Sequence, residues 1–128
     1  MSYATQAATY REMEVLSASP GQLVVIVYDH LLVTLRRLRL ALVGGPTEVR
    51  GTLLSKARLV VGELMATLDP AGGGEVASGL GSLYAFFYAE LVDQGASPDA
   101  RRLDRMTAMV AELREAFAAA AGGAAAGG

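Results

Sequence analysis

His30 is the only histidine of the chain, and it is the first residue to test for chemistry. A phosphotransfer bundle needs just one exposed histidine on a helix, so this function is an alternative to weigh. Val33 and Thr34 stand where such domains usually carry a basic and a small residue, which disfavours it. A di-iron bundle requires Glu-x-x-His pairs, and Val27 occupies the position three residues before His30. The metal hypothesis is therefore excluded, and we expect neither a metal nor a cofactor.

Carboxylates and glycines offer no further chemistry. Glu12 with Glu14 and Glu63 with Asp69 are the nearest carboxylate groupings, and the sequence gives no sign of the pocket that general acid–base catalysis requires. The glycines at 72–74 lack the following Lys and Ser or Thr of a phosphate-binding loop, so they are predicted to be a linker. We therefore expect a protein that is not an enzyme.

Composition excludes several other classes of function. A formal charge of −2 with interspersed signs leaves no basic patch for nucleic acid. The absence of Cys removes disulfides, thiolate catalysis and Cys-based zinc sites. The start at residues 1–6 has neither a positive region nor an apolar run of a signal peptide, and the longest apolar stretch covers only residues 23–28. We expect no membrane insertion.

The elements that must position any functional surface are helices. Four segments carry the i, i+3, i+4, i+7 apolar spacing, with Gly or Pro between them. The first should begin with Ser19 as cap, Pro20 in the first turn and Gln22 completing a capping box, and end before the glycines at 44–45. The second helix is predicted from about 46 or 47 to 68, and the third from after 74 to 95. The fourth is predicted to begin with Ser97 as cap and Pro98 in the first turn, and to end at about 120.

Short connections make neighbouring helices antiparallel, so the predicted fold is all-α, an up-down-up-down four-helix bundle with an N-terminal arm. The expected organisation is an arm at 1–16, the bundle at 17–121 and a Gly/Ala-rich tail at 122–128. The predicted core seams are Val24, Val27, Tyr28, Leu31, Leu35, Leu38 and Leu42; Val49, Leu53, Val60, Leu64 and Leu68; Val76, Leu80, Leu83, Tyr84, Phe87 and Leu91; and Leu103, Met106, Val110, Leu113 and Phe117.

The first helix has more apolar surface than one seam requires. Ile26, Val33 and Leu40 recur every seven residues on the side opposite the seam. We expect such an apolar row to be buried by another segment or molecule: the N-terminal arm, a second subunit or a client peptide. The alternative is a skewed bundle in which both faces are internal. The next two helices also have wide apolar arcs. Leu54, Val61 and Met65 widen the arc of the second helix, and Phe86 and Tyr88 widen that of the third. We expect both arcs to be mainly core.

Several motifs together resemble one family. They are Tyr10 in the arm, Leu16 to Pro20, Leu23 with Tyr28 and Asp29, the stretch Glu63-Leu64-Met65-Ala66-Thr67-Leu68-Asp69, Leu83 with Tyr84, and Glu112 with Leu113 before an aromatic. In this order and spacing they are similar to the flagellar secretion chaperone FliS family. Phe117 stands where the family commonly has Trp, and Gln94 with Gly95 replaces its usual Ala-Asn at the end of the third helix.

The resemblance implies a cytoplasmic chaperone that binds the disordered C-terminal segment of flagellin, prevents premature polymerisation and presents the subunit to the flagellar export gate. It also implies an arm that can lie over an apolar groove. Combined with the surplus row, it gives a predicted client-binding groove of six residues: Tyr10, Leu23, Ile26, Val33, Leu40 and Met65. A bundle for another secreted client stays open as an alternative, and so does the choice between monomer and homodimer.

Overall fold

The first helix begins where the sequence predicts. Ser19 caps it: the Gln22 N–H donates to Ser19 Oγ (3.3 Å), and the Ser19 N–H donates to Gln22 Oε1 (2.9 Å). This capping box satisfies two backbone donors that a helix start leaves free. Helix α2 then runs over Pro20–Leu42, and Gly44 at φ 141° makes the turn that follows. Only glycine adopts that backbone conformation without strain.

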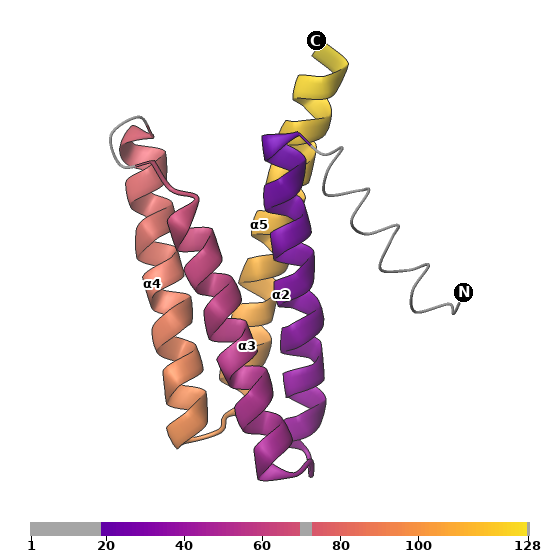
Figure 1. Cartoon of the computed structure of the whole chain (residues 1–128), viewed down its shortest axis with the longest axis vertical. Helices are drawn as coiled ribbons and strands as arrows, with labels where there is room; N and C mark the ends of the chain where they lie inside the picture. Colours follow the sequence, from indigo (N-terminus) through magenta and orange to yellow (C-terminus); the bar gives the residue numbers. More distant parts are fainter. Residues whose placement is uncertain (1–18, 70–72, 128) are drawn as a thin grey trace, which may run out of the picture.

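The computed structural model describes residues 19–69 and 73–127, with side chains to 122. In these ranges it is an antiparallel four-helix bundle without strands: α2, α3 at Thr47–Ala66, α4 at Gly74–Ala96 and α5 at Ala100–Gly127 (Figure 1). The predicted fold class is confirmed. The arm at 1–16, including Tyr10, lies outside the described residues.

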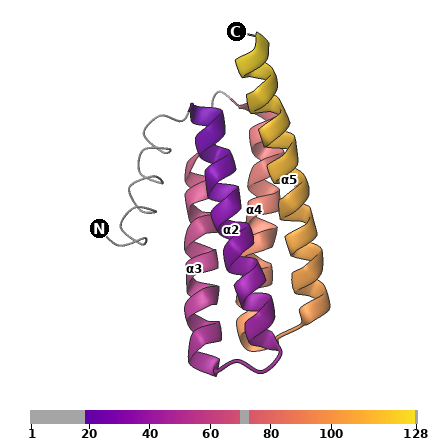
Figure 2. The same ribbon diagram turned by 90° about the vertical axis from the view of Figure 1, so that its right-hand side faces the viewer.

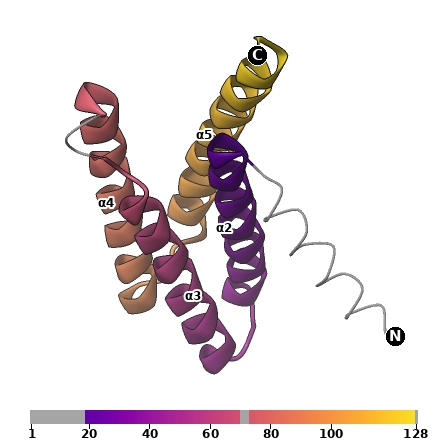
Figure 3. The same cartoon turned by 45° about the horizontal axis from the view of Figure 1, so that its top comes forward.

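Three of the four interfaces between neighbouring helices are closely packed. α2 packs along α5 and α3, and α3 packs along α4, whereas α4 and α5 contact each other much less. Figure 2 shows α2 between α3 and α5, and Figure 3 shows the start of α4 spread away from the end of α5. The bundle is therefore closed at the α4–α5 turn and more open at the opposite end.

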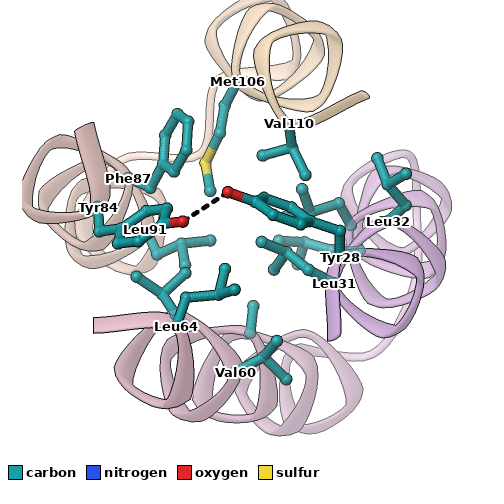
Figure 4. Close-up of a cluster of buried hydrophobic side chains, with 14 of the residues drawn as sticks. Tyr28, Leu31, Leu32, Val60, Leu64, Tyr84, Phe87, Leu91, Met106 and Val110 are labelled. Carbon is teal, nitrogen blue, oxygen red and sulfur yellow. Dashed lines mark hydrogen bonds between the residues drawn. The ribbon is translucent and has the colours of Figure 1, made fainter. Parts of the chain in front are cut away.

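The core lies where the apolar stripes meet. Tyr28, Leu31, Leu64, Phe87 and Met106 are buried together at the centre (Figure 4). The remaining predicted seam residues are buried or partly buried, apart from two. Those two are Val49, 47% exposed, and Val76, 73% exposed, so their assignment to the core was wrong. Each lies in the first turn of its helix, where fewer neighbouring side chains can cover it.

The start of α5 differs from the prediction. Ser97 is not its cap: the Ser97 N–H donates to the Asp93 carbonyl (2.7 Å), which ends α4. Asp99 caps α5 instead, because its Oδ1 accepts from the Arg102 N–H (3.1 Å). Pro98 therefore precedes the helix rather than lying in its first turn. Ser and Asp are both good caps, and the one that follows the turn is used.

The ends of α3 and α5 also differ from the prediction, and α4 is one residue longer at each end than expected. α3 ends at Ala66 rather than Leu68, and the Thr67 hydroxyl donates to the Leu64 carbonyl (2.6 Å) at that end. A difference of two residues is usual at a frayed end. α5 does not fade near Ala120 but continues to Gly127. Alanine has the highest helix propensity, which favours this continuation.

Candidate functional site

The surplus apolar row on α2 is exposed. Val33 is 44% exposed and Leu40 77% exposed, and Ile26, two helical turns before Val33, is half-buried. Residues seven apart on a helix recur on nearly one line, so the three form one stripe along the outer face. A skewed bundle in which both faces of this helix are internal is therefore wrong for Val33 and Leu40.

Ion pairs fix which way the stripe faces. Asp29 and Arg39 lie on one flank of α2 and pair with α5, through Arg114 Nε to Asp29 Oδ1 (2.9 Å) and Arg39 Nε to Asp104 Oδ1 (2.9 Å). On the opposite flank the side chain of Thr34 is buried, and its hydroxyl donates to the His30 carbonyl (2.9 Å). With both flanks turned toward neighbouring helices, the stripe between them points away from the bundle.

The other predicted groove residues do not all join this stripe. Leu23 is half-buried, one turn before Ile26. Met65 is 42% exposed, but it lies on the side of α3 that also carries Leu54, and Leu68 follows just beyond the end of the helix. These two leucines face α4: a methyl group on Gly95 would lie 3.8 Å from Leu54 Cδ1, and one on Gly81 would lie 3.6 Å from Leu68 Cδ1.

The structure thus brings Ile26, Val33 and Leu40 together and places Met65 on a different surface. The expectation that the wide arcs are mainly core holds for only some residues. Leu54 and Val61 are buried, whereas Phe86 and Tyr88 are 45% and 42% exposed.

Sequence reasoning missed a groove on the outer side of α3. It is open, mostly apolar and about 660 Å³ in volume. Its lining residues come from α3, apart from one on α4, and are Ser55, Arg58, Leu59, Gly62, Glu63, Ala66 and Tyr88. Leu59 is 69% exposed. The signal in the sequence was a leucine outside the core seam with small residues at one-turn and two-turn distances from it.

A smaller hollow of about 200 Å³ lies where α4 and α5 diverge, lined by Leu83, Met109, Glu112 and Leu113. Glu90 and Asp93 of α4 hold Arg102 of α5 at the closed end. These hydrogen bonds and charges raise the pKa of the Arg102 guanidinium, so it stays charged. This cluster joins two helices.

The described residues offer few side chains for catalysis or metal binding. His30 is exposed on α2. Within residues 19–69 and 73–127 no three His, Cys, Asp or Glu side chains gather in a way that could hold a metal ion. Of the helices in the same ranges, none is long and apolar enough to cross a membrane. Two surfaces are therefore the candidates for binding a partner: the exposed stripe on α2 and the groove on the outer side of α3.

Known proteins identify the family. A family model described as "Flagellar protein FliS" matches residues 2–124. The chain belongs to the FliS family. It is 34% identical over 107 residues to the flagellar secretion chaperone FliS of Salmonella typhimurium, covering 83% of this chain and 79% of that protein. It is 31% identical over 106 residues to flagellar secretion chaperone FliSB of Pseudomonas aeruginosa, covering 83% and 84%.

A solved structure agrees on the fold of this FliS-family chain. The crystal structure of a flagellar chaperone from bacteria superposes with a TM-score of 0.75 and 18% identity, covering 91% of this chain and 96% of that one. At this identity the likeness concerns the fold. The family resemblance noted from the motifs is confirmed.

Proposed function

We propose that this chain is a cytoplasmic, non-enzymatic chaperone that binds the disordered C-terminal segment of flagellin, prevents its premature polymerisation and delivers it to the flagellar export gate. Family membership supports a role as a flagellar secretion chaperone. The observation that carries the finer proposal is the exposed apolar stripe of Val33 and Leu40 on α2. A segment that folds into an amphipathic helix buries its apolar face against such a stripe.

The test is calorimetric titration with a flagellin C-terminal peptide. Val33→Asp would place an unpaired carboxylate where the apolar face of the client must lie, and so would Leu40→Asp. Desolvating that carboxylate costs several kcal/mol, so affinity should fall by about a hundredfold or more. Val92→Asp is the matched control, because Val92 on α4 is 48% exposed, close to the 44% of Val33. It should bind like the parent chain.

Two results would contradict this proposal in different ways. If the folded Val33→Asp and Leu40→Asp variants bind normally while the parent binds, the client lies on another face. If the parent chain binds no flagellin peptide, the client is a different secreted protein, which is the alternative left open by the sequence. Phosphotransfer through His30 has less support, because the family is one of chaperones.

A further inference from the structure

The exposed stripe on α2 has an arginine on each side. Arg36 and Arg37 lie between Val33 and Leu40 along the helix. At about 100° per residue, the two arginines fall about 50° to either side of the line that joins Val33 and Leu40. Both arginine side chains are exposed. This part of the stripe therefore has an apolar centre and a positively charged border.

Neither arginine is neutralised within the described part of the chain. In residues 19–69 and 73–127, neither Arg36 nor Arg37 forms an ion pair. The whole chain has a formal charge of −2, so two adjacent arginines without a carboxylate partner differ from the average surface. Their guanidinium groups are available to a partner molecule.

The carboxylates closest to Arg36 along this side of α2 are bound to other arginines. Asp29, seven residues before Arg36, accepts from Arg114 of α5 (2.9 Å). Farther along α2, Arg39 donates to Asp104 of α5 (2.9 Å). Both carboxylates therefore hold other side chains, and neither is paired with Arg36.

The part of α5 opposite Arg36 carries no charge. Because α2 and α5 are antiparallel, the two ion pairs between them fix which residues are level, and Arg36 is level with Thr107. The Thr107 hydroxyl donates to the Leu103 carbonyl of its own helix (2.9 Å). Ala108 and Ala111 lie next to Thr107 on the same side of α5. At this level the counter-charge for Arg36 has to come from a partner.

A partner that covers the stripe has to match both of its parts. Apolar side chains of the partner would cover Val33 and Leu40, as in the binding of an amphipathic helix. The border of the partner would then meet the two guanidinium groups. Carboxylates can accept bidentate hydrogen bonds from arginine, whereas lysine or arginine at these positions would bring like charges together. An uncharged border would leave the arginines without a counter-charge.

We infer that Arg36 and Arg37 select the client: they favour an amphipathic helical segment whose apolar face is bordered on both sides by Asp or Glu. Such selection rests on the proposed function, in which the α2 stripe binds the client. It adds the two residues that discriminate between client segments and the charge that they recognise.

Calorimetric titration of the full chain with three synthetic helical peptides tests this selection. The peptides share one apolar face and differ only in the residues that border it, which are all Glu, all Gln or all Lys. The parent chain should bind the Glu peptide about tenfold more tightly than the Gln peptide, and the Lys peptide most weakly. High salt should reduce these differences, because it screens charge pairs at the edge of an interface.

Reversing the charge of the two arginines should reverse the order of the peptides. The R36E/R37E variant should bind the Lys peptide most tightly and the Glu peptide most weakly. R101E/R105E is the matched control, because Arg101 and Arg105 are exposed on another helix, α5, and the change in net charge is the same. This control should keep the order of the parent chain.

Three results would overturn the selection. They are equal affinities of the parent chain for the Glu and Gln peptides, no binding of any of the three peptides, and an R36E/R37E variant that keeps the parent's order. The proposed function fails in a different way, through a parent chain that binds no flagellin peptide. A parent chain that prefers the Glu peptide and binds no flagellin peptide would support the selection and assign it to another secreted client.

Discussion

The hydroxyl oxygens of Tyr28 and Tyr84 lie 2.6 Å apart in the middle of the bundle, where they hydrogen-bond α2 to α4. Both side chains are buried, and apolar side chains such as Leu31, Leu64 and Met106 surround them (Figure 4). The two helices are diagonal partners, and in the described residues they pack against each other far less than neighbouring helices do. This bond is a buried polar contact across the bundle, in addition to the Arg102 ion pairs that join α4 to α5.

The tyrosine pair should behave as a unit when mutated. Tyr28→Phe or Tyr84→Phe alone leaves the other hydroxyl buried without its partner, which should lower the free energy of unfolding by about 1 to 3 kcal/mol. The double Phe variant removes both hydroxyls and should cost less than the sum of the two single changes. Denaturant unfolding of the four proteins gives the cycle. Additive single costs would show that the hydroxyls are not coupled.

The same pair predicts a loss of stability in alkali. Burial raises the pKa of Tyr28 above its ordinary 10.0, the hydrogen bond to Tyr84 adds to this, and burial also raises the pKa of Tyr84. Above pH 10 the unfolded chain therefore releases protons that the folded chain keeps. Stability should be full below pH 10 and fall above it by up to about 1.4 kcal/mol per pH unit for Tyr28, with a smaller loss for Tyr84, whose pKa the shared hydrogen bond lowers.

Thermal melts from neutral pH to pH 11 measure this alkaline slope. The double Phe variant is the control, and its stability should fall less steeply than that of the parent chain over the same range. Equal slopes for the two proteins would assign the alkaline loss to other groups.

The start of α5 should depend on Asp99 rather than Ser97. Asp99→Ala removes the acceptor of the Arg102 N–H and should lower the free energy of unfolding by about 1 kcal/mol. Ser97→Ala should change it by less than about 0.5 kcal/mol, as for an exposed site. Gln94 is buried and bonds the Asp99 N–H and carbonyl, so Gln94→Leu should cost about 1 to 3 kcal/mol. Denaturant midpoints rank the three variants, and a larger loss for Ser97→Ala than for Asp99→Ala would contradict this assignment.

The features that the sequence predicts correctly are local or periodic. The α2 start follows from Ser19, Pro20 and Gln22 alone, and the core seams follow from the repeat of apolar residues. Asp99 rather than Ser97 caps α5, and Gln94 bonds the Asp99 backbone across the turn, a side-chain contact that the apolar spacing does not predict.

For the candidate surfaces too, the sequence predicts the periodic feature but not the contacts between helices. The stripe of Val33 and Leu40 is visible as a seven-residue repeat, and both residues are exposed. Met65 was grouped with them because it is apolar and outside a seam, but which side of α3 faces α4 is decided by packing. The α3 groove was missed for the same reason, because its far wall is Tyr88 of another helix.

His30 should not accept a phosphoryl group. Its side chain is exposed on α2, yet Val33 and Thr34 follow it where phosphotransfer domains usually carry a basic and a small residue. Incubation with a phosphodonor-loaded receiver domain should leave the chain unlabelled. Acid-labile labelling that disappears in His30→Gln would contradict this and would revive the catalytic alternative.

One helix allows a direct comparison between an inner and an outer leucine. Leu31 is 0% exposed, and Leu40 is 77% exposed on the outer stripe of α2. Leu31→Asp should unfold the bundle, because the cost of a buried unpaired carboxylate approaches the whole stability of a small domain, about 5 to 15 kcal/mol. Leu40→Asp should change the free energy of unfolding by about 0.5 kcal/mol or less, since its carboxylate stays in water. Circular dichroism melts of the two variants test this difference. A Leu40→Asp variant that melts as early as Leu31→Asp would show that the outer stripe is needed for folding. A loss of flagellin binding by Leu40→Asp would then report unfolding rather than a lost contact.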